Sequence, residues 1–60
     1  MDKLLNIRES AELLRLSPNT LRAWVFQKRM PFVRLGRRIL FREKDLQAMV
    51  EKGAEEAKEN

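Results

Sequence analysis

The sequence predicts a mainly α-helical domain with one short β-hairpin, and three observations support this fold class. Two stretches with helical periodicity lie about two residues apart, and each begins with a helix-capping signal. Two short stretches of alternating apolar and basic residues then flank a glycine, as is typical of a hairpin. A final stretch with apolar residues at helical spacing predicts a third helix.

The first helix is expected over about residues 7–15. Asn6 is a good N-cap, and Glu9, three residues later, can complete a capping box. Ile7, Ala11 and Leu14 fall on one face at helical spacing, with Leu13 beside them.

The second helix is expected over about residues 18–27. Ser17 can cap its start, and Pro18 suits the first helical position because no backbone N–H is needed there. A connection this short between two helices predicts a helix-turn-helix.

The second helix has one side for the core and one for a ligand. At 100° per residue, Leu21, Trp24 and Val25 cluster on the core side. The opposite side carries an amide, a guanidinium and apolar groups, which are the groups that read base edges and thymine methyls in the major groove of DNA. The candidate major-groove residues are Asn19, Thr20, Arg22, Ala23 and Phe26.

The hairpin is expected over residues 33–41. Val33 and Leu35 alternate with Arg34 on the first strand, and Ile39 and Phe41 face inward on the second. The turn at Gly36 then presents Arg37 and Arg38, with Arg34 alongside, to a minor groove or to phosphates.

The third helix is expected to start near Glu43. Leu46, Met49 and Val50 have the spacing of a core contact. Packing is expected to end near Val50, so the predicted domain covers residues 1–52 and residues 53–60 form an acidic, frayed tail. Ordering of the tail by a partner is the weaker alternative.

Composition excludes several classes of function. The 60 residues allow one small domain, and the lack of Cys and His excludes disulfides and the commonest metal ligands. The only glycines are Gly36 and Gly53, so there is no glycine-rich phosphate loop. We expect no catalysis, no cofactor, no membrane segment and a cytoplasmic location.

The charge distribution points to a polyanionic partner. The net charge of +4 divides into −1 for residues 1–14, +8 for 15–42 and −3 for 43–60. The middle segment has no acidic residue, which predicts a continuous surface for nucleic acid. Its cations are Arg15, Arg22, Lys28, Arg29, Arg34, Arg37, Arg38 and Arg42.

The chain resembles the excisionase family of small DNA-binding domains, which are related to the DNA-binding heads of MerR-type regulators. Four blocks carry the resemblance, in order and at the right spacing: residues 5–14, 16–24, 30–38 and 42–46. The resemblance implies a winged helix-turn-helix in which residues 17–27 form the recognition helix and the turn at residues 36–38 forms the tip of the wing. It also implies that Trp24 joins the core and can offer its indole N–H to the DNA backbone.

The resemblance implies a biological role as well. Excisionase-like proteins bind duplex DNA as several protomers, bend it and assist an integrase or recombinase. A small transcriptional regulator acting with RNA polymerase is the alternative. In either case we expect a protein of a bacterium, phage or mobile element. The residues expected to contact phosphates are Arg15, Ser17, Trp24, Lys28, Arg34, Arg37, Arg38 and Arg42.

The chain departs from the family pattern at two turns. Relatives usually carry Gly where this chain has Arg15, and a Gly is also common near the position of Lys28. Both positions are expected to need a left-handed backbone, which costs a non-glycine residue about 1 kcal/mol.

Alternatives remain at the level of the sequence. Arg22 could pair with Glu9 or Glu12, and Phe26 could contact a thymine methyl, support the wing or face a second protomer. The basic surface could instead dock an acidic protein. RNA is less favoured because no row of exposed aromatics suggests base stacking.

Overall fold

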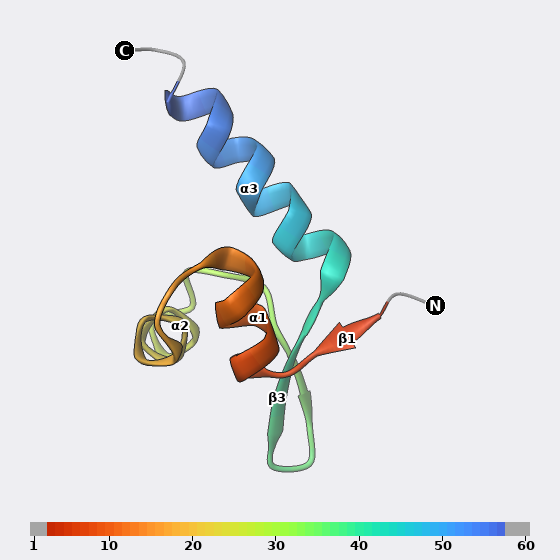
Figure 1. Ribbon diagram of the computed structural model, residues 1–60. Helices are drawn as coiled ribbons and strands as arrows, with labels where there is room; N and C mark the ends of the chain where they lie inside the picture. Colours follow the sequence, from red (N-terminus) through yellow and green to blue (C-terminus); the bar gives the residue numbers. More distant parts are fainter. Residues whose placement is uncertain (1–2, 58–60) are drawn as a thin grey trace.

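The computed structural model describes residues 3–57, which form three helices and a three-stranded antiparallel sheet (Figure 1). This arrangement confirms the predicted winged helix-turn-helix. In chain order the elements are β1 (Leu4–Leu5), α1 (Ile7–Leu14), α2 (Pro18–Phe26), β2 (Val33–Leu35), β3 (Arg38–Arg42) and α3 (Glu43–Ala57).

Both predicted caps of the first two helices are present. The Glu9 backbone N–H donates to Asn6 Oδ1 at 2.7 Å, and the Asn6 N–H donates to Glu9 Oε1 at 2.9 Å, so the capping box is complete. At the start of α2 the Thr20 N–H donates to Ser17 Oγ at 3.1 Å. These bonds satisfy backbone donors that a helix start otherwise leaves without partners.

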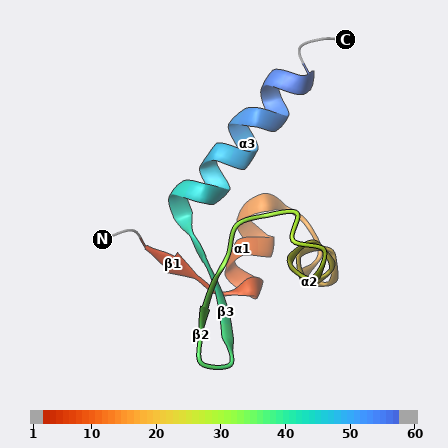
Figure 2. The same cartoon turned by 180° about the vertical axis from the view of Figure 1, so that it is seen from behind.

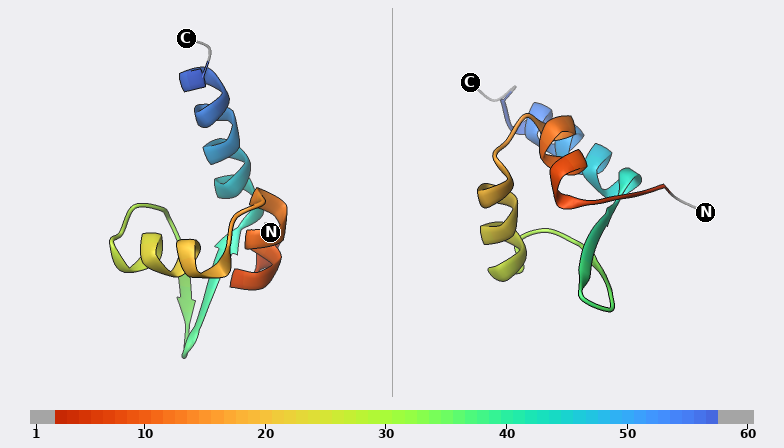
Figure 3. Two further views of the ribbon diagram at one scale, coloured as in Figure 1. Left: turned by 60° about the vertical axis from the view of Figure 1, so that its left-hand side comes forward. Right: turned by 60° about the horizontal axis from the view of Figure 1, so that its bottom comes forward.

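The two turns that were predicted to have a left-handed backbone, at Arg15 and Lys28, do have one. Arg15 has φ 58° and Lys28 has φ 56°. Each belongs to a Schellman motif, in which the next residue's N–H reaches back five residues: Leu16 donates to the Ala11 carbonyl at 2.9 Å, and Arg29 to the Trp24 carbonyl at 2.8 Å. The motifs end α1 and α2 abruptly, so α2 crosses α1 steeply (Figure 3).

The sheet contains one strand that the sequence did not predict. β1 pairs with β3 through Leu4 opposite Arg42 and Leu5 opposite Phe41, which gives the strand order β1-β3-β2. The two-stranded wing is therefore anchored to the N-terminal strand (Figure 2). At its tip Gly36 has φ 60°, a conformation that tight two-residue hairpin turns require.

The core lies where the two helices of the helix-turn-helix, the sheet and the start of α3 meet. Leu21, Phe41 and Leu46 are fully buried there, one from each of α2, β3 and α3. Small side chains at Ser10 and Ala11 let α1 approach its neighbours closely. Met30, just after α2, is also buried. The partly buried residues packed against this core are Ile7, Leu14, Leu16, Trp24, Phe32, Ile39 and Met49.

Three large apolar side chains are more than half exposed: Leu13 (51%), Leu35 (53%) and Val50 (55%). Leu13 and Val50 have the helical spacing of core residues. α3 contacts the core through its first turns and then diverges from the body of the domain (Figure 1). Leu13 and Val50 both line an open groove of about 360 Å³. Leu35 lies on the outer face of β2, an edge strand that no second layer covers.

α3 continues as a helix to Ala57, beyond the expected end of packing. The division into a domain over residues 1–52 and a frayed tail over 53–60 stays a prediction, and residues 58–60 lie outside the described residues. Within residues 3–57, no helix combines the length and apolar character needed to cross a membrane.

Candidate nucleic-acid interface

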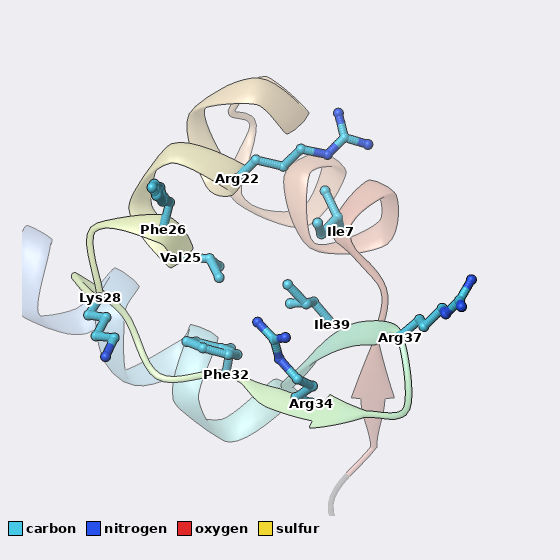
Figure 4. Close-up of a pocket in the computed structure, with 9 residues that line it drawn as sticks. All are labelled: Ile7, Arg22, Val25, Phe26, Lys28, Phe32, Arg34, Arg37 and Ile39. Carbon is cyan, nitrogen blue, oxygen red and sulfur yellow. The ribbon is translucent and has the colours of Figure 1, made fainter.

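A groove of about 500 Å³ separates α2 from the hairpin of β2 and β3 (Figure 4). Its lining combines an apolar floor with basic edges. The apolar members are Ile7, Val25, Phe26, Phe32 and Ile39, and the basic members are Arg22, Lys28, Arg34 and Arg37. No acidic side chain lines this groove.

The apolar and the basic side chains around the groove occupy different positions. Val25, Phe32 and Ile39 face one another across the space, whereas Arg22 and Arg37 extend outward at its edges (Figure 4). An apolar floor suits the sugar and base carbons of a nucleic acid, and edges that carry guanidinium groups suit its phosphates. The groove therefore has the chemistry to receive a polyanionic backbone.

Strand register explains why Arg34 reaches this groove. Arg34 pairs directly with Ile39, and paired residues of antiparallel strands lie on the same face of the sheet. Arg34 thus shares the inner face with Ile39 and Phe41. Leu35 pairs with Arg38, and both lie on the outer face.

The outward side of α2 carries four of the five candidate major-groove residues. Asn19, Arg22, Ala23 and Phe26 are all exposed, and Phe26 retains 79% of its surface. The Arg22 guanidinium makes a long contact of 3.5 Å with Asn19 Oδ1. Among the described residues no ion pair joins Arg22 to Glu9 or Glu12, and Glu9 is engaged in the capping box.

Thr20 occupies a different position from the other four. It is half-buried, and its hydroxyl lies 2.9 Å from that of Ser17 in a hydrogen bond. Thr20 and Ser17 therefore form part of the helix start, and neither residue lines the groove.

All eight cations of the acid-free segment are exposed, but the groove brings only part of the set together. Lys28, Arg34 and Arg37 line it with Arg22. Three of the cations predicted to contact phosphates lie elsewhere: Arg15 in the turn between α1 and α2, and Arg38 and Arg42 on the outer face of β3. Ser17 and Trp24, also predicted to contact phosphates, do not line the groove either.

Arg29 was not among the predicted contact residues, yet the structure gives it a defined place. Its guanidinium carbon lies 5.4 Å from the centre of the Trp24 ring, within the range of a cation–π contact. The position of Arg29 could have been predicted from the sequence. The residue that follows a left-handed turn at the end of a helix folds back toward the last turn of that helix, and Arg29 follows the turn at Lys28.

The charged side chains of the groove are suited to binding an anion. No cluster of three or more metal-binding side chains occurs among the described residues. The groove presents guanidinium groups, an ammonium group and apolar surface, and the cationic groups are suited to bind an anion such as a phosphate.

Comparison with known protein families matches residues 4–54 to the helix-turn-helix domain family. Neither the curated proteins nor the solved structures gave a significant match. The family match covers most of the chain and coincides with the folded elements from β1 into α3. A helix-turn-helix domain indicates DNA as a partner. The chain belongs to the helix-turn-helix domain family, which includes excisionase-like small DNA-binding domains.

Proposed function

We propose that this chain binds duplex DNA without doing chemistry on it, with α2 in the major groove and the hairpin against the adjacent backbone. The observation that carries the proposal is the groove between α2 and the hairpin, with its apolar floor and four basic edge groups. One strand of the duplex lies along this groove when α2 enters the DNA. The outward residues of α2 then face the base edges.

The dimensions of an α-helix favour this arrangement. A helix with its side chains is about 10–12 Å wide, and the major groove of B-DNA is about 12 Å wide. Arg22 has the fork of donors that recognises guanine, and Asn19 has the amide that recognises adenine. Phe26 supplies apolar surface for a thymine methyl or a sugar.

The affinity of the chain for duplex DNA should fall steeply with salt. If about five phosphates are neutralised, a plot of log K against log salt has a slope of about −4 to −5. Fluorescence anisotropy with a labelled mixed-sequence duplex, repeated over a range of salt concentrations, measures this slope. A flat response would contradict DNA binding through the basic surface.

Arg22→Ala should relax sequence preference. The lost base contact costs about 1–3 kcal/mol at the preferred site and little on other sequences. Double replacement of Arg37 and Arg38 by Ala should instead weaken binding to all sequences alike. The measurement compares both variants on a site recovered by selection from random duplexes and on a mixed-sequence duplex. Equal, uniform losses from the two variants would refute this division of roles.

We further propose a cytoplasmic role in recombination directionality, in which several protomers bind along DNA, bend it and assist an integrase or recombinase. One such unit covers few base pairs, so useful affinity requires more than one protomer. A small transcriptional regulator working with RNA polymerase is the second candidate. Footprinting on DNA flanking the gene separates them, since the sites either flank a recombination core or overlap a promoter.

A protein-binding module is the alternative of another class, favoured by the same exposed cations. An acidic protein partner would be displaced from the basic surface only weakly by unrelated duplex DNA at moderate salt. Efficient displacement by such DNA supports the nucleic-acid interface.

A further inference from the structure

The side of α2 away from the hairpin carries a cation of its own, because Arg29 stacks on Trp24 there. Trp24 is two positions from both Arg22 and Phe26, which is about 200° around the helix axis. Arg22 and Phe26 line the groove beside the hairpin, whereas Trp24 and Arg29 do not. Ala23 lies between Arg22 and Trp24, at the middle of the outward face.

The backbone places Arg29 on this side of α2. The left-handed residue Lys28 reverses the chain, and the Arg29 N–H then donates to the Trp24 carbonyl at 2.8 Å. In this motif the residue that follows the turn usually makes an apolar contact with the residue whose carbonyl it bonds. Here the guanidinium over the indole ring replaces that apolar contact, at 5.4 Å from the ring centre.

Stacking leaves the donors of Arg29 available. An arginine can rest the face of its guanidinium on an aromatic ring while the N–H groups at its edge bind a phosphate. The Arg29 side chain is exposed and Trp24 is half-buried, so the ring is the fixed partner. A cation already seated in this way loses less rotamer freedom on binding than a free side chain.

We propose that Arg29, positioned by Trp24, binds a phosphate of the DNA strand on the far side of the major groove from the hairpin. The inference rests on the proposed function, because it requires α2 in the major groove. A helix that fills the major groove of DNA has one sugar–phosphate strand on each of its two sides. The hairpin, through Arg37, contacts the phosphates of one DNA strand, and Arg29 contacts a phosphate of the other DNA strand.

The first test measures salt dependence on a labelled mixed-sequence duplex of about 20 base pairs, long enough for about two helical turns. Arg29→Gln should reduce the magnitude of the slope by about 0.9 and the affinity at 0.1 M salt by about 8-fold, the effect of one phosphate contact. Arg8→Gln is the matched control, because it removes the same charge from an exposed position on α1. Its slope should equal that of the parent chain.

The second test separates positioning from structure. Trp24→Leu should lower affinity in the parent chain but cause no further loss in the Arg29→Gln background, whereas Trp24→Phe should retain most binding because it keeps a ring face. An equal loss from Trp24→Leu in both backgrounds would overturn the positioning role. Since Trp24 is the only tryptophan, its emission also reports the contact: DNA should change it in the parent chain and much less in Arg29→Gln.

The third test locates the phosphate. On the selected site, single phosphates are replaced by neutral methylphosphonates, and binding is measured for the parent chain, Arg29→Gln and Arg37→Gln. Each variant should become insensitive to one replacement that weakens the parent chain, and the two positions should lie on opposite strands. Positions on the same strand, or an unchanged slope for Arg29→Gln beside a salt-dependent parent, overturn the inference alone. A parent chain without salt-dependent binding overturns the proposed function with it.

Discussion

Phe41→Ala is expected to unfold the domain at room temperature. Phe41 is fully buried on β3 and shares the core with Leu21 and Leu46. Truncating a buried phenylalanine costs about 3–5 kcal/mol, and a core of this size supplies rarely more than about 3–5 kcal/mol in total. Thermal melting followed by far-UV circular dichroism should therefore show a cooperative transition in the parent chain and none in the variant.

Leu35→Ala is the matched control for this prediction. Leu35 is also an apolar residue of the hairpin, but it is 53% exposed on the outer face of the sheet. Substitutions at such sites usually change stability by about 0.5 kcal/mol or less. A Phe41→Ala variant that melts like Leu35→Ala would show that the described core does not hold the domain together.

Neutralising three edge residues of the groove is expected to abolish most DNA binding. The variant replaces Lys28, Arg34 and Arg37 with glutamine and leaves the apolar floor intact. If each residue neutralises one phosphate, the slope of log K against log salt should shrink by about 2.7, and affinity at 0.1 M salt should fall by about 500-fold. Anisotropy titrations against the mixed-sequence duplex measure both quantities.

A variant with the same net charge identifies the cause of that loss. Lys3, Arg8 and Lys52 are exposed and lie outside the groove, so their replacement by glutamine changes the total charge equally. This control should bind nearly as well as the parent chain. Comparable losses in the two triple variants would mean that net charge alone attracts DNA, and the groove would then lose its proposed role.

Local signals in the sequence predicted much of the fold. Asn6 and Ser17 cap the first two helices as expected, because capping depends on residues within one turn of helix. The left-handed turns at Arg15 and Lys28 were also predicted, through the resemblance to a family with glycines there. The Gly36 turn follows from the few residues that tolerate its conformation.

Features that depend on distant residues were not predicted. Leu4 and Leu5 are too few to indicate a strand, and they become one only because β3 offers a free edge. Leu13 and Val50 have the spacing of core residues, but the divergence of α3 from α1 leaves them exposed. Helical periodicity indicates which face is apolar and cannot indicate whether another element covers it.

For the candidate site too, local sequence predicted one part and only the tertiary structure revealed the other. The outward face of α2 could be predicted from helical geometry, which makes Asn19, Arg22, Ala23 and Phe26 neighbours. The grouping of Arg34 and Arg37 with α2, apart from Arg38, required the register of the hairpin. Alternation along a strand separates two faces, but the choice of the face that turns toward the helix belongs to the tertiary structure.

The junction between β3 and α3 has a mechanical consequence. β3 ends at Arg42 and α3 begins at Glu43, with no loop between them. The Glu43 N–H also donates to the Lys3 carbonyl at 3.0 Å, which fixes the junction to the N-terminal strand. The hairpin and α3 project in opposite directions from this point (Figure 1). With no loop to absorb a rotation, the direction of α3 and the direction of the hairpin are coupled, and a partner that reoriented α3 would be expected to reorient the hairpin as well.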